Sequence, residues 1–250
     1  MFKKKIELKM RKPYSDDEAF IEKWNGSDPE DRHILVIDEF GNTGKSCYKE
    51  TKFGYGVSDV DDVDNYMKIA QDNRIKYGNS EQKAKHSTMD ERKLISMKIR
   101  DTKTKTSCVY IDKNKPMPEY MMSGKKPNRI YGVLNDTLEK TLPKHGVVWV
   151  VIDNNTQYVN DSRLKKECKS HSNKKRTVYG NQYSSEGRSI TSNLLQTNDY
   201  VANAARSRTE LNERERSRIL KMRFMRINSS ISGLKRRSVK GPGGRKAPSR

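Results

Sequence analysis

The chain has 250 residues, of which 32% are hydrophobic and 34% charged, and its formal net charge at pH 7 is +20. This length allows one sizeable domain with appendages, and the lean apolar content predicts that part of the chain is poorly packed. No apolar run has the length of a membrane span or a signal peptide, so we expect a cytoplasmic protein without a membrane contact.

Short strand-like segments alternate with helical patterns in the first half of the chain. Strands are expected over residues 34–38, 52–57 and 106–112. A helix is expected over 62–77, where apolar side chains recur at helical spacing. A second helix should begin near Thr88, because Thr88 and Glu91 have the spacing of a capping box. Residues 1–30 lack such patterns and are expected to form an irregular lead-in.

The second half of the chain continues the alternation. The most apolar segment, residues 146–153, predicts a central strand, and residues 176–183 predict an edge strand. Helices are expected over 130–142, 161–172, 190–208 and, rich in basic residues, 213–227. This alternation indicates an α/β fold with a partly parallel sheet. We predict three regions: a lead-in (1–30), one α/β domain (31–210), and a basic helix with a disordered cationic tail (211–250).

Basic residues are concentrated at the C-terminal end. Residues 211–250 hold 13 Lys and Arg against two Glu, and the last stretch combines Gly and Pro with few apolar residues. Such a segment is typical of a tail that binds phosphate backbones without reading sequence. The expected nucleic-acid contacts are Arg218, Lys221, Arg223, Arg226, Lys235, Arg236 and Arg237. A solvated tail with no particular partner is the alternative, as are membrane phosphates and acidic proteins.

Three aliphatic runs end in the dipeptide Ile-Asp, at Asp38, Asp112 and Asp153. Strands that each deliver a carboxylate at their carboxyl end gather acids at one edge of a sheet. Gathered carboxylates repel one another, so they persist mainly where a cation neutralises them. A strand-terminal Asp can also be a turn starter or a helix cap, and Asp112 can simply be solvated beside Lys113.

A fourth acid, Asp199, stands in the otherwise apolar and small stretch of the helix expected over 190–208. An Asp on the core side of a helix needs a partner, so Asp199 is expected to face the same crevice unless it lies on the solvent side. Two other motifs are weaker. The segment GNTGKS at 41–46 has too few residues between its glycines for a P-loop. Cys168 and His171 have zinc-ligand spacing, but no second pair accompanies them.

Four segments, in this order along the chain, resemble a known family. VIDEFGNTG at 36–44 looks like the D-E-S-G signature of the RNase H-like family called domain of unknown function 3800. SEQKAK at 80–85 resembles its Glu-x-Lys element, VVID at 150–153 its strand ending in Asp, and NLLQTNDYVANA at 193–204 its C-terminal helix. The chain departs from the family pattern at Phe40, where the family has Ser, and at Thr197-Asn198, where it has a small apolar pair.

The resemblance implies an RNase H-like mixed sheet with flanking helices. In that fold, acids from the first strand, a later strand and the last core helix surround one or two Mg²⁺ or Mn²⁺ ions. The implied ligands are Asp38, Asp153 and Asp199, with Glu81 as a fourth. Lys83 would contact the scissile phosphate or orient Glu81. The implied chemistry is metal-assisted phosphodiester cleavage.

These observations lead to a metal-dependent nuclease that acts on RNA or DNA, with RNA favoured. The competing hypothesis is a non-catalytic RNA-binding protein, for example one associated with the ribosome, that uses the same scaffold and the basic tail. A transposase or integrase shares the fold but ranks lowest, because no separate site-recognition domain is visible in 250 residues.

Overall fold

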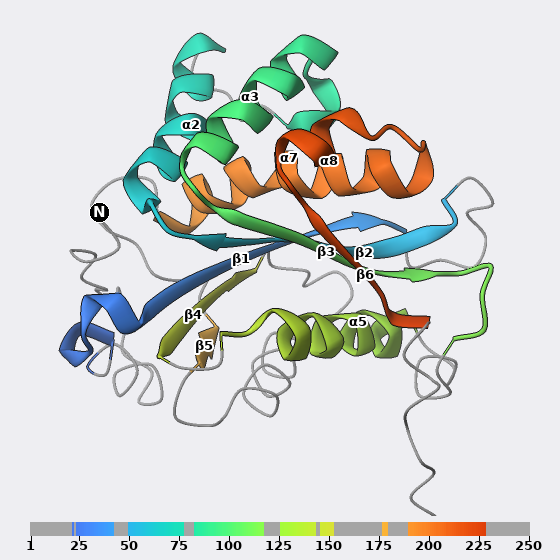
Figure 1. The fold of residues 1–250 in the computed structure, drawn as a ribbon, viewed down its shortest axis with the longest axis horizontal. Coiled ribbons are helices and arrows are strands. Elements are labelled where there is room, and N and C mark those ends of the chain that lie inside the picture. The colour runs from blue at the N-terminus through green and yellow to red at the C-terminus, as the bar shows by residue number, and fades with distance from the viewer. Residues whose placement is uncertain are drawn as a thin grey trace, which may run out of the picture.

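A six-stranded mixed sheet forms the centre of the computed structural model, with helices on both faces (Figure 1). The structure describes residues 22, 24–42, 50–77, 83–117, 126–143, 146–152, 177–179 and 190–228. The α/β class and the mixed sheet with flanking helices are as predicted from the sequence.

The strands are β1 (Arg32–Gly41), β2 (Lys52–Val60), β3 (Lys105–Asp112), β4 (Val147–Ile152), β5 (Thr177–Tyr179) and β6 (Arg223–Arg226). Their order in the sheet is β5-β4-β1-β2-β3-β6. Strand β2 is antiparallel to β1 and β3, whereas β4 is parallel to β1, β5 to β4 and β6 to β3. Five of these six strands therefore run in one direction, and their carboxyl ends lie at the same end of the sheet.

The helices are α2 (Val63–Lys76), α3 (Met89–Asp101), α5 (Lys126–Thr141), α7 (Ile190–Glu210) and α8 (Glu215–Ile219). Figure 1 shows α2, α3, α7 and α8 on one face of the sheet and α5 on the other. Two short 3₁₀ turns, η2 (Pro29–Asp31) and η3 (Ala84–His86), complete the elements.

Each face of the sheet has its own hydrophobic core. The α7-side core includes Val36, Trp149 and Val201, and the α5-side core includes Leu35 and Val150. Neighbouring residues of β1 and β4 thus belong alternately to the two cores, as side chains alternate across a sheet. Because both faces of β4 are covered, it is apolar throughout.

Two predictions about strand and helix placement are wrong. The apolar strand β4 lies second from one edge, not at the centre, because β1 and β2 occupy the middle of the sheet. The basic helix predicted over 213–227 ends after the five residues of α8, and the chain continues as strand β6 beside β3. Leu220 and Met222 enter the α7-side core, so this basic segment is fixed by apolar anchors within it.

Several predictions fall outside the described residues. These are most of the lead-in (1–30), the short polar helix over 161–172 and the tail beyond Asn228, so the three-region division stays a prediction. Within the described part of the chain, no helix is both long and apolar enough to cross a membrane.

The capping box predicted at the start of α3 is present. Thr88 Oγ1 accepts from the Glu91 N–H at 3.3 Å, and Glu91 Oε2 accepts from the Thr88 N–H at 2.9 Å. Glu91 also links α3 to the end of α2, because Lys76 Nζ lies 2.6 Å from its Oε1 and the Tyr77 hydroxyl donates to the same oxygen.

These contacts make stability depend on acidity. Hydrogen bonds from Lys76, Tyr77 and Thr88 lower the pKa of Glu91 from 4.5 to about 2. A group whose folded pKa is depressed stabilises the fold fully above its unfolded pKa and loses that contribution as pH falls through the folded value. Between pH 4.5 and about 2, we therefore expect the free energy of unfolding to fall more steeply in the wild type than in Glu91→Gln. Urea unfolding across this range measures both slopes, and equal slopes would contradict the prediction.

Candidate active site

Asp38 lies near the carboxyl end of β1, on the face of the sheet that α7 covers. Val36 and Phe40, two residues to either side, both belong to the α7-side core, whereas Leu35 and Ile37 belong to the α5-side core. Alternation along the strand therefore directs Asp38 toward α7. Its side chain is half-buried, and its Oδ1 accepts from the Glu39 N–H at 2.9 Å.

Helix α7 touches the sheet beside Asp38. Gly56 of β2 is the Cα partner of Asp38. A Cβ atom added at Gly56 would lie 2.5 Å from the Cα of Ala202, so the helix backbone rests directly on this residue. Ala202 is one helical turn beyond Asp199. The point of closest approach thus brings the turn of α7 that carries Asp199 to the level of Asp38.

A buried polar network fixes this approach. The Asn198 side chain donates to the Gly56 carbonyl at 3.0 Å, and its Oδ1 accepts from Ser58 Oγ at 2.6 Å and from the Tyr66 hydroxyl at 3.2 Å. Burial raises the pKa of Tyr66, a hydrogen bond with Ser58 opposes the rise, and the negative charge of Asp38 adds to it. The carboxylate of Asp38 is therefore close enough to this network to influence it.

Asp199 anchors the segment that carries the predicted Glu-x-Lys element. Its Oδ2 accepts from the Ala84 N–H at 2.6 Å. Arg92 of α3 holds the same turn, donating from Nε to the Ala84 carbonyl at 2.7 Å and from Nη2 to the Lys85 carbonyl at 2.9 Å. Lys83, which is exposed, is the residue directly before Ala84. The structure therefore binds Asp199 to the backbone of Ala84, the residue next to the predicted site residue Lys83.

The other two predicted acids, Glu81 and Asp153, lie outside the described residues. The last described residue before Asp153 is Ile152, which is the Cα partner of Ile37, the residue before Asp38. Glu81 is two residues before Lys83.

Two further acids stand apart from Asp38 and Asp199. Asp112 opposes Lys52, and its Oδ2 lies 3.2 Å from Lys52 Nζ. Because Cys108 opposes Gly56, Asp112 is about 13 Å beyond the level of Asp38 along the sheet. Glu39 follows Ile37 on the α5 face, opposite to Asp38. The Ile-Asp pattern therefore includes one acid that lies apart from Asp38, because Asp112 forms its own ion pair and turn.

The departures from the family pattern have structural explanations. Phe40 is a buried residue of the α7-side core. Thr197 donates from Oγ1 to the Tyr66 carbonyl at 3.0 Å, and Asn198 forms the network with β2. In this chain, polar bonds at Thr197 and Asn198 attach α7 to α2 and β2.

The predicted basic contacts are only partly brought together. Arg218, Lys221, Arg223 and Arg226 are all exposed. On β6, however, Arg223 opposes Ser107 on the α5 face and Arg226 opposes Tyr110 on the α7 face, so they do not form the single stripe that a helix predicts. Lys235, Arg236 and Arg237 lie outside the described residues.

The described acids fit a hard divalent cation by chemistry but do not form a complete site. Carboxylate oxygens are the ligands that Mg²⁺ and Mn²⁺ prefer. The N–H bond from Ala84 is the kind of outer contact that orients a ligating carboxylate. Among the described residues, however, no group of three or more His, Cys, Asp and Glu is placed to hold a metal ion. Sequence reasoning missed Arg92 and Ala84, because no local pattern marks a long-range backbone contact.

No protein-family model matches the chain, and no curated protein matches it. Among solved structures, the chain is similar to one in the PCNA:RNase HII complex from Archaeoglobus fulgidus, at 16% sequence identity and a TM-score of 0.48. The match covers 73% of this chain and 77% of that chain. It is a likeness in fold at low sequence identity, and it assigns no function.

Proposed function

We propose that the protein is a metal-dependent phosphodiester hydrolase, a nuclease that acts on RNA or DNA through an RNase H-like site. The observation that carries the proposal is the contact of the α7 backbone, one turn after Asp199, with Gly56, the residue that pairs with Asp38. Asp38 of β1 and Asp199 of α7 come from the first strand and the C-terminal helix from which the resemblance predicts the acids. The proposed metal ligands are Asp38, Glu81, Asp153 and Asp199.

The strand register supports the inclusion of Asp153. Val36 pairs with Val151 and Ile37 with Ile152, and both valines belong to the α7-side core. Residues paired in parallel strands direct their side chains to the same face. Asp153 directly follows Ile152, so we propose it as the ligand that accompanies Asp38.

Chain reach supports the inclusion of Glu81. It is two residues from Lys83, so its Cα stays within about 7 Å of that of Lys83. Lys83 in turn precedes Ala84, whose N–H is bound to Asp199. Glu81 is therefore proposed as the ligand that accompanies Asp199.

Bound Mg²⁺ or Mn²⁺ would activate the attacking water and stabilise the leaving oxygen of the phosphodiester. The carboxylates supply oxygen ligands from a strand and a helix that a buried network holds together. The Ala84 N–H fixes the orientation of Asp199, and Arg92 fixes the turn that contains Ala84. The exposed Lys83 carries a positive charge that attracts the substrate phosphate to this edge.

The second candidate function is a non-catalytic RNA-binding protein. Four exposed basic side chains favour it, because negatively charged phosphate backbones bind to positive charge. They are Arg218, Lys221, Arg223 and Arg226. Cleavage itself separates the two functions.

The deciding experiment incubates labelled RNA and DNA oligonucleotides with the full chain, with Mg²⁺, Mn²⁺ or a chelator. A matched chain lacking residues 229–250 tests the tail, and this boundary spares α8 and β6, which belong to the folded sheet. We expect metal-dependent cleavage by both chains, with weaker binding by the shorter one. Absence of cleavage with either metal, together with nucleic-acid binding by the full chain, would favour the binding protein.

A further inference from the structure

A second charged feature lies at the end of the sheet where β3 begins, whereas Asp38 lies near the carboxyl end of the parallel strand β1. This feature is a cavity of about 590 Å³ between the end of α5, the start of β3 and strand β6. Leu35, Val57 and Met225 contribute to its apolar floor, and all three belong to or pack on the α5-side core. Leu35 is level with Lys105 across β2, three residues before the level of Asp38, so the cavity is distinct from the candidate active site.

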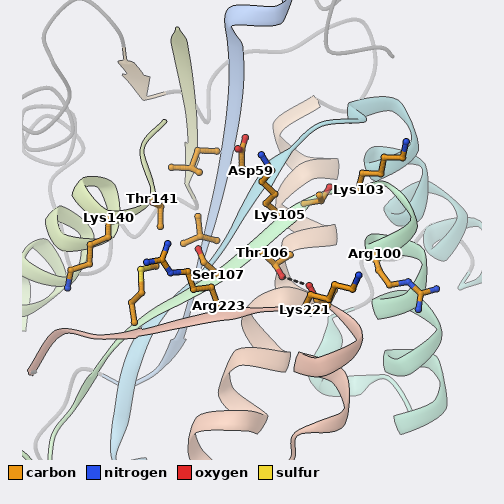
Figure 2. A pocket seen from close by; sticks show the side chains of 15 residues that line it. Asp59, Arg100, Lys103, Lys105, Thr106, Ser107, Lys140, Thr141, Lys221 and Arg223 are labelled. Carbon is orange, nitrogen blue, oxygen red and sulfur yellow. Dashed lines mark hydrogen bonds between the residues drawn. The ribbon is translucent and has the colours of Figure 1, made fainter. Parts of the chain in front are cut away.

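The cavity is strongly basic. Its lining includes the six cationic residues Arg100, Lys103, Lys105, Lys140, Lys221 and Arg223. Figure 2 shows Lys105 and Arg223 between Lys140 on one side and Lys103, Lys221 and Arg100 on the other. Asp59 is the acidic residue among the described residues of the lining. The excess of cations makes this a site of positive potential.

Most of this charge is not neutralised within the described part of the chain. Arg100 binds its exposed neighbour Asp101 at 2.8 Å. In the described residues, no ion pair involves Lys103, Lys105, Lys221 or Arg223. Cations gathered in one cavity repel one another, as gathered carboxylates do, and a bound anion relieves that repulsion.

Two of the lysines occupy backbone positions that favour glycine. Lys103 follows α3 with φ of 59°, and Lys221 follows α8 with φ of 51°. Glycine is the common residue at such a helix stop, because a side chain costs conformational energy in the left-handed region. Both positions therefore carry a long cationic side chain although the backbone conformation there favours glycine. Backbone strain of this kind accompanies binding sites.

We infer that this cavity binds a phosphorylated nucleotide, either free or at the end of a nucleic-acid strand. Phosphate groups match the cluster of Lys and Arg donors, and the heterocyclic base matches the apolar floor. The volume lies within the range of about 300–1,000 Å³ that small-molecule sites have. The inference does not rest on the proposed nuclease function, since neither Asp38 nor Asp199 is among the residues that line the cavity.

The test measures the affinity of the full chain for ADP, for a short single-stranded oligonucleotide with a 5′-phosphate, and for the same oligonucleotide with a 5′-hydroxyl. Calorimetry at fixed salt without divalent metal gives each affinity. The test variant is Lys103→Gly combined with Lys221→Gly, which removes two cations where glycine suits the backbone. Asn212→Gly is the matched control, because Asn212 has φ of 56° and is outside the cavity lining.

We expect the double variant to bind nucleotide about tenfold more weakly or worse while its melting temperature stays equal or rises. The Asn212→Gly variant should keep wild-type affinity. Variant-sensitive binding of ADP indicates a free nucleotide, and variant-sensitive binding of only the 5′-phosphorylated oligonucleotide indicates a strand end. The inference is overturned if the wild type binds none of the three probes, or if the double variant binds all of them as the wild type does.

Discussion

Replacement of Asp38 with asparagine is expected to reduce metal-dependent cleavage on the order of 10³-fold, because a lost metal ligand removes several kcal/mol of transition-state stabilisation. The substitution preserves the size of the side chain, and Asp38 is only half-buried, so folding should not explain the loss. Initial rates with saturating oligonucleotide measure the effect. Nucleic-acid affinity should be retained, because the substitution leaves the exposed basic side chains of residues 218–226 unchanged.

The matched control for this prediction is Asp112→Asn. Asp112 also ends an Ile-Asp strand on the α7 face, yet it pairs with Lys52 away from the site. Its substitution should leave the cleavage rate of the folded protein within about threefold of the wild type, because the buried Asp112 lies about 13 Å beyond the level of Asp38 along the sheet. Wild-type cleavage by Asp38→Asn would refute the assignment of Asp38, whatever the control does.

The second large effect concerns stability. Gly56→Ala is expected to lower the free energy of unfolding by about 3 kcal/mol, the upper range for an overpacked core site. The added methyl would lie 2.5 Å from Ala202 Cα and 2.6 Å from its backbone nitrogen, so the helix must shift as a unit. Urea unfolding measures the change. Gly26→Ala is the control, because nothing lies within 4 Å of a Cβ at that exposed position.

The same Gly56 substitution also tests whether α7 positions the site. Moving the helix away from β2 carries Asp199 away from Asp38, so cleavage should fall by more than the unfolded fraction explains. An equal stability loss in Gly56→Ala and Gly26→Ala would show that α7 does not rest on β2 as described.

Local patterns were sufficient to predict most elements. The segments around Asp38 and Ile152 are buried on both faces and read as strands from their apolar runs alone. The spacing of Thr88 and Glu91 predicted the start of α3, since a capping box is a contact between residues close in sequence. The α7 boundary at Ile190 followed from apolar spacing.

Contacts between distant segments set the limits of sequence reasoning. Asp38 and Asp112 end strands of similar sequence. Only the arrangement of the sheet shows that Asp38 lies beneath α7, whereas Asp112 pairs with Lys52. The basic segment after Glu210 reads as a helix, yet residues 223–226 add a strand beside β3 because Leu220 and Met222 enter the core. The basic cavity was likewise invisible, since its lining comes from five separate parts of the chain.

The central claim is that Asp38 belongs to a metal site, and thermal melting with increasing Mg²⁺ or Mn²⁺ tests it most directly. A ligand that binds only the folded state raises the melting temperature. Because removal of a repelling acid can itself stabilise the metal-free protein, the relevant quantity is the metal-dependent shift. The account predicts a shift in the wild type and in Asp112→Asn that Asp38→Asn and Asp199→Asn lack. An equal shift in all four proteins, or none in the wild type, would contradict it.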